Sequence, residues 1–162
     1  MKKHLIIFFS LLLTLCAIGQ KADKIPAHQS NSYIELKKFK ADTLGYVQKN
    51  FIDNKSKYIG KDISVLLHDI EIPIISYMPG ISFNNDDIMP DITLQFYSME
   101  KTTQLANSPN KPTDIIIELL KPVPMDSATQ LFGKSQGKWT DAERKYYGKQ
   151  KIGDILTTNW NL

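Results

Sequence analysis

The sequence predicts an α+β domain: an antiparallel sheet of three to four strands, with an N-terminal helix pair and one C-terminal helix packed on one face. Three observations support this fold class. Apolar residues at helical spacing occupy residues 42–70, three runs rich in β-branched and aromatic residues follow, and a helix-capping motif stands near the C-terminus. The segments between the runs are short and polar, which favours antiparallel pairing over crossover helices.

Two helices are expected first. Asp42 is a suitable N-cap for a helix that Gly60 ends, and Asp62 is a suitable N-cap for a shorter helix that follows. The apolar residues at helical spacing in the first are Leu44, Val47, Phe51 and Tyr58 or Ile59. Those in the second are Ile63, Leu66, Leu67 and Ile70. Both helices are therefore expected to be amphipathic and to face the core.

The three strand-like runs are residues 71–78, 91–98 and 114–121. Pro73 cannot donate to a ladder, so the first strand is expected at a sheet edge or a bulge. The second run alternates Ile92, Leu94 and Phe96 with Thr93, Gln95 and Tyr97, which predicts one buried and one wetter face. The third run is apolar on both sides, so that strand is expected to be central or covered by a helix.

The C-terminal part begins with a short helical turn expected from Asp126 through Phe132, closed by Gly133. Thr140 and Glu143 then have the spacing of a capping box, which predicts a helix start. Gly148 and Gly153 would each weaken a helix interior by about 1 kcal/mol. We therefore expect residues 149–158 to form a last strand, the alternative being a continued helix through Ile152, Ile155 and Leu156.

Residues 1–19 have the pattern of a signal peptide: Lys2 and Lys3, an apolar run, and small residues at Ala17 and Gly19. The apolar run of about fifteen residues is shorter than the roughly twenty that span a bilayer. We therefore expect cleavage between Gly19 and Gln20, export to the periplasm or the exterior, and no transmembrane segment in the mature chain. Residues 20–32 are expected to be a flexible tether and residues 33–162 a single domain.

Lipidation at Cys16 is the alternative fate of the leader, but a bulky Leu15 directly before the cysteine argues against it. Cleavage after Gly19 removes Cys16, which leaves a cysteine-free mature chain and excludes disulfides and thiolate chemistry. Removal of the two leader lysines lowers the formal charge from +3 to +1. Since Arg144 is the only arginine, nucleic acid is not an expected partner. Abundant Lys, Ile and Asn are typical of an AT-rich bacterial genome.

Two sets of residues offer catalytic or metal chemistry. His68 with the acidic Asp69 is the better histidine candidate for a hydrolase, because His28 lies in the expected tether. The alternative is that His68, near a helix C-terminus, only complements the helix dipole. The oxygen-rich residues 84–87 with Asp91 offer a hard-cation site or an acid–base pair, but Asn and Asp also favour plain turns. We expect the turn, and no phosphate-binding, zinc or dinucleotide motif indicates a cofactor.

The candidate binding face is aromatic and basic; its residues are Trp139, Arg144, Lys145, Tyr146 and Tyr147. The alternative is that Trp139, Tyr147 and Trp160 fill the core, as large aromatic residues usually do. The sequence is best interpreted as an exported, non-catalytic domain that binds a protein, peptide or glycan, as an inhibitor, immunity protein or accessory envelope factor. The alternatives are a small hydrolase that uses His68 and a structural lipoprotein anchored at Cys16.

Overall fold

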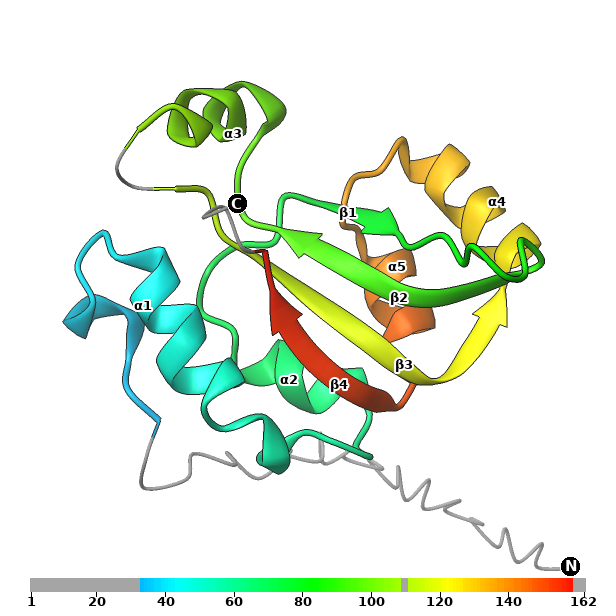
Figure 1. Ribbon diagram of the computed structural model, residues 1–162, viewed down its shortest axis with the longest axis horizontal. Helices are drawn as coiled ribbons and strands as arrows, with labels where there is room; N and C mark the ends of the chain where they lie inside the picture. The colour runs from blue at the N-terminus through cyan, green and yellow to red at the C-terminus, as the bar shows by residue number, and fades with distance from the viewer. Residues whose placement is uncertain (1–32, 109–110, 159–162) are drawn as a thin grey trace, which may run out of the picture.

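The computed structural model describes residues 33–108 and 111–158. Within them, the chain forms five α-helices and a four-stranded antiparallel sheet with the strand order β1-β2-β3-β4 (Figure 1). The α+β class, the antiparallel sheet and the helices on one side of it are as the sequence predicts. The predicted signal peptide, cleavage site and tether lie outside the described residues.

The N-terminal helical segment is more broken than expected. Asp42 caps α1 (Thr43–Val47) by accepting a hydrogen bond from the Gly45 amide at 2.8 Å. The predicted single helix to residue 59 is wrong, because α1 widens into a π-helical turn, η2 (Gln48–Ile52), and then a 3-10 turn, η3 (Lys55–Lys57). Val47, Phe51 and Tyr58 are buried as predicted, whereas Leu44 is exposed and Tyr46 is buried.

The second predicted helix is α2 (Ile63–Asp69), which Gly60 precedes with a positive φ of 76°. Ile63, Leu66 and Leu67 are buried as expected. Asp62 stands at the N-cap position but makes no capping hydrogen bond; its carboxylate pairs with the Lys151 ammonium at 3.0 Å. Asp62 therefore ties the start of α2 to the segment before the last strand.

The sheet consists of β1 (Ser76–Pro79), β2 (Ile88–Gln95), β3 (Asp114–Pro124) and β4 (Ile152–Thr157). The prediction of a first strand over residues 71–78 is corrected: Pro73 lies before a short edge strand. The second strand starts three residues earlier than predicted, with a register shift between Met89 and Asp91, around Pro90. The third strand is central, and residues 152–157 form the last strand, as the helix-breaking glycines indicate.

Three more helices complete the fold. α3 (Met99–Ala106) was not expected: Ser98 caps it, and none of its residues is buried. α4 (Met125–Ser135) is longer than the predicted turn and runs past Gly133 to Gln136 and Gly137, both with positive φ. α5 (Asp141–Tyr147) begins with the predicted capping box of Thr140 and Glu143.

One hydrophobic core lies between the helices and the inner face of the sheet. The strands supply the alternate residues Tyr77, Ile92, Leu94, Ile115, Ile117 and Ile155. The helical segments supply Tyr46, Phe51, Leu66, Ala128 and Tyr147. No helix among the described residues has the length and apolar character needed to cross a bilayer.

Candidate functional site

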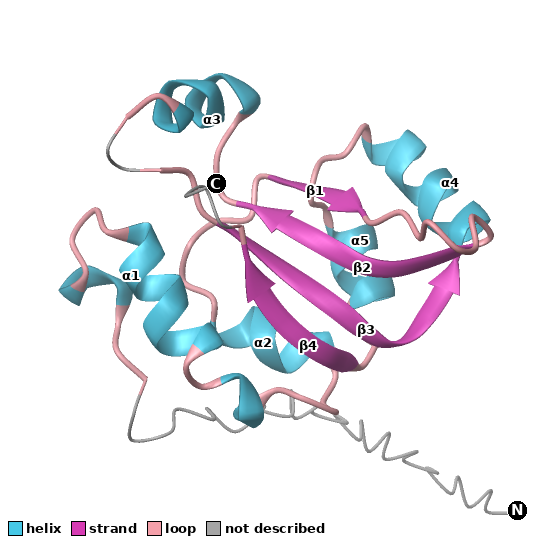
Figure 2. Ribbon diagram, viewed as in Figure 1, coloured by secondary structure: helices cyan, strands magenta, loops and turns pink. Residues whose placement is uncertain are grey.

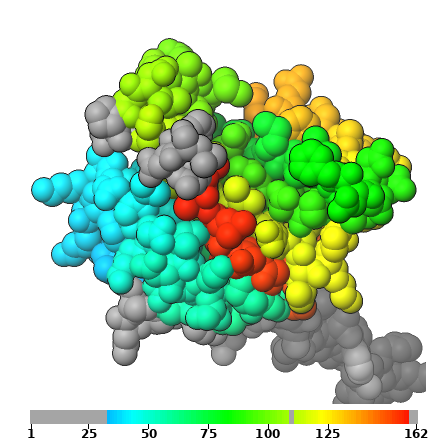
Figure 3. All heavy atoms as spheres, viewed as in Figure 1, coloured from blue at the N-terminus to red at the C-terminus, as the bar shows by residue number. Residues whose placement is uncertain are grey.

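Among the described residues, no helix covers the outer face of the sheet. In Figures 1 and 2 the strands lie in front of α2 and α5, and α4 packs against β1, β2 and β3. In the space-filling view of the same side, atoms of β3 (yellow) and β4 (red) reach the surface (Figure 3). The strand register arranges the outward residues of this open face into rows that cross the sheet.

The middle row of the open face is apolar. Cross-strand pairing aligns Met78 with Thr93, Thr93 with Ile116, and Ile116 with Leu156. Met78 is 47% exposed and Leu156 38%, while the two inner members are half-buried. Opposite residues have Cβ atoms about 4.5–5.5 Å apart, so the four side chains form one continuous stripe. A contiguous exposed apolar patch of this kind is typical of binding surfaces.

The next row is acidic. Asp91 pairs with Glu118 and Glu118 with Asp154 across β2, β3 and β4. The Lys55 ammonium contacts both Asp154 carboxylate oxygens, at 2.7 and 2.9 Å, and this hydrogen bonding holds the pKa of Asp154 below its usual range. Burial, and then the neighbouring Glu118 carboxylate, raise the pKa of Asp91. The Asp91 carboxylate lies directly over Gly80, where a Cβ would collide with it.

The loop between β1 and β2 extends the open face. It exposes Ile81 and the whole side chain of Phe83. The Asp87 amide donates to Asn85 Oδ1 at 3.0 Å, which is an Asx turn of the kind expected for residues 84–87. In residues 33–108 and 111–158, no group of three acidic, histidine or cysteine side chains is arranged to hold a metal ion.

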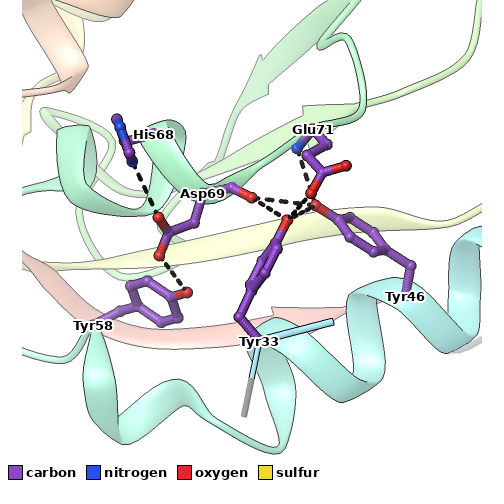
Figure 4. A network of polar contacts seen from close by, with 6 residues as sticks. All are labelled: Tyr33, Tyr46, Tyr58, His68, Asp69 and Glu71. Carbon is purple, nitrogen blue, oxygen red and sulfur yellow. Dashed lines mark hydrogen bonds and ion pairs between the residues drawn. The ribbon is translucent and has the colours of Figure 1, made fainter. Parts of the chain in front are cut away.

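His68 and Asp69 lie in a network of polar contacts at the end of α2 (Figure 4). The His68 Nδ1 and Asp69 Oδ1 atoms are 3.2 Å apart, and Asp69 Oδ2 accepts a hydrogen bond from the Tyr58 hydroxyl at 2.9 Å. Asp69 is the last residue of α2, and its carboxylate meets the His68 ring although the two residues are adjacent in the chain. Burial and the Asp69 carboxylate raise the pKa of Tyr58, which keeps its hydroxyl protonated.

The other half of this network holds the start of the domain. The Tyr33 hydroxyl lies 2.7 Å from the Asp69 carbonyl oxygen, 2.8 Å from Glu71 Oε1 and 2.8 Å from the Tyr46 hydroxyl (Figure 4). Asn50 adds two hydrogen bonds to the backbone of Ile34. These contacts join residues far apart in sequence, and they fix where the preceding segment leaves the domain.

The network has part of the arrangement of a hydrolase. An imidazole beside a carboxylate is oriented as a general base, and the His68 side chain is 45% exposed. A nucleophile is the missing part. Among the described residues, no serine or threonine hydroxyl forms a hydrogen bond with His68. The contacts that are present serve instead to anchor Tyr33 and the end of α2.

The sequence-predicted binding residues are divided between the core and the surface. Tyr147 is fully buried, and its ring stacks on Trp139 at 6.1 Å with an interplanar angle of 16°. Arg144 and Lys145 are exposed on α5, and Tyr146 is half-buried. Tyr77 on β1 makes edge contacts with Trp139 and Tyr147. The rings of Trp139 and Tyr147 thus pack together, in line with the alternative that these aromatic residues fill the core. Trp160 lies outside the described residues. Binding through this segment stays a prediction.

Comparison with known proteins found no matching family model, curated protein or solved structure. The candidate site therefore depends on the geometry of this chain alone.

Proposed function

We propose that this chain is an exported, non-catalytic domain that binds a protein partner through the open face of its sheet. The observation that carries the proposal is the apolar row Met78–Thr93–Ile116–Leu156, which crosses all four strands without a covering helix. Thr93 and Ile116 lie on the two inner strands, each of which is paired on both sides, so the centre of this face is a rigid binding surface and its ordering cost on binding is low.

The edges of the sheet make binding by strand addition a weaker alternative. The Tyr77 amide donates to the Gly137 carbonyl oxygen at 3.0 Å, and the Trp139 amide donates to that of Ile75. At the other edge, the Gly60 amide donates to the Ile152 carbonyl oxygen at 2.7 Å, and Asp154 Oδ1 accepts from the Ile155 amide. Both edges are thus partly occupied by groups of the chain itself, which favours the face as the binding surface.

Export is part of the proposal and is supported by the leader pattern of residues 1–19. The intact mass of the protein isolated from its own host tests it. A mature chain that starts at Gln20 is the expected result. A mass that corresponds to a lipidated Cys16 supports the anchored alternative, and an unprocessed chain in the cytosol contradicts export.

The binding proposal is tested with two double variants of the full chain. Met78→Ser with Leu156→Ser removes apolar area from the open face. Leu44→Ser with Ile59→Ser removes area of similar exposure, 45% and 38%, from the N-terminal helical segment. We expect the first variant to lose co-purification of its partner from host extracts and the second to retain it, with both folded by circular dichroism. Equal retention by the two variants contradicts the proposal.

The second candidate function is hydrolysis that uses His68 as a general base. The 3.2 Å contact between His68 and Asp69 favours it. His68→Ala is the direct test, because His68 is partly exposed and its removal leaves the Tyr33 hydrogen bonds in place. Loss of a measured hydrolytic activity in a folded variant supports this function, and unchanged activity excludes it.

A further inference from the structure

Two carboxylates of the acidic row, Asp91 and Glu118, lie side by side across the open face. Asp91 and Glu118 are direct cross-strand partners, and like charges in that position repel. Lys55 pairs with Asp154 at the end of the row, but across the described part of the chain no lysine or arginine pairs with Asp91 or Glu118. The row therefore contains an unfavourable interaction that a cation placed over it would relieve.

The apolar row lies directly beside these carboxylates. Thr93 and Asp91 on β2 are two residues apart, as are Ile116 and Glu118 on β3, so the two rows are separated by about 7 Å. The exposed Ile81 follows Gly80 and brings further apolar area to the same end of the face. A matching surface would present apolar and positively charged side chains at that spacing.

We propose, building on the proposed function, that the open face binds a cationic segment of a partner protein. Its lysine or arginine side chains lie over Asp91 and Glu118, and its apolar side chains lie on Met78, Ile116 and Leu156. Charge complementarity identifies this partner in preference to others. The apolar and acidic rows contain no lysine or arginine that a second copy could place over Asp91 and Glu118, and nucleic acids or anionic lipids would be repelled.

The probe is a fluorescent heptapeptide, Lys-Ser-Val-Ser-Lys-Ser-Val, whose extended form presents lysine and valine two residues apart on one face. The reference is the same peptide with glutamine in place of lysine. Both are titrated by anisotropy at low salt against the full mature chain. Asp91→Asn with Glu118→Gln removes the two unpaired charges of the face. Asp126→Asn with Asp141→Asn removes two charges from α4 and α5, on the other side of the sheet, and is the matched control (Figure 1).

We expect the lysine peptide to bind the wild-type chain, about tenfold weaker binding to the open-face variant, and little change with the control. Amide shifts on β2, β3 and β4 are expected in the complex. Equal binding of the lysine and glutamine peptides overturns the cationic partner but leaves binding through the face intact. Equal loss of affinity for the lysine peptide in both variants would mean attraction by net charge alone and would overturn the proposal. Failure of the lysine peptide to bind the wild-type chain would overturn it as well. Retention of the natural partner, measured with the serine variants above, tests the proposed function separately.

Discussion

Asp114 offers a sharp test of the structure, because its carboxyl group is buried and forms no ion pair within residues 33–108 and 111–158. It is the first residue of β3, its side chain is among the buried polar ones, and burial raises its pKa from 3.8 to about 6. The folded chain thus binds this proton more tightly than the unfolded chain does. Its contribution to the free energy of unfolding is most favourable below about pH 4 and is lost as the pH rises through about 6.

The size of this effect follows from the two pKa values. Each pH unit between them corresponds to about 1.4 kcal/mol, so the ionised Asp114 costs ~3 kcal/mol of stability once the pH is above both. Asp114→Asn carries no charge at any pH and avoids that cost. We therefore expect the variant to gain up to ~3 kcal/mol relative to the wild-type chain between about pH 4 and pH 7.5.

Urea unfolding of both proteins at the two pH values measures this difference, provided that unfolding is two-state. Asp126→Asn, at an exposed position on α4, is the control and should give nearly the same free-energy difference at both pH values. If the Asp114→Asn difference is also the same at both pH values, the carboxyl group is not buried as described, and the reasoning is refuted.

Three further substitutions test other parts of the fold by urea unfolding. Ile117→Ala removes a fully buried inner-face side chain and should lower the free energy of unfolding by about 2–5 kcal/mol. Ile116→Ala on the open face should lower it clearly less, and equal losses would contradict the assignment of the two faces. Thr140→Ala removes the capping box of α5 and should cost ~1 kcal/mol, while an unchanged stability would show that the cap is not formed. Tyr33→Phe removes the hydroxyl that contacts Asp69, Glu71 and Tyr46, and it should lower the free energy of unfolding by about 1–3 kcal/mol. Amide hydrogen exchange in residues 33–36 should become faster, and unaltered exchange there would argue against the anchoring role of Tyr33.

Local patterns in the sequence were sufficient for much of the fold. The capping box at Thr140 and the glycine at position 148 identified α5 and the strand after it, because both act on the backbone within a few residues. α3 was missed because it is short and none of its residues is buried, so its few apolar residues mark no core face. The broken helix after Asp42 was missed because a π-helical turn alters the period on which the prediction depends.

The candidate site was harder to predict because it depends on pairing between distant segments. The apolar and acidic rows exist only in one register, and a shift between Met89 and Asp91 sets which residues face Glu118. The Tyr33 network joins residues up to 38 positions apart. The alternation of residues 91–98 did predict one wetter face of the sheet. The residue types on that face were the one signal of the candidate site that the sequence offered.

Photo-crosslinking in the host cell tests the central claim, binding through the open face, most directly. A benzophenone side chain replaces Thr93 in the apolar row of the full chain, and the control replaces Thr129 on α4, which packs against the other side of the sheet. We predict a discrete protein adduct from position 93 and none from position 129. Adducts from position 129 alone, or none from either position in a folded and exported chain, would contradict the claim.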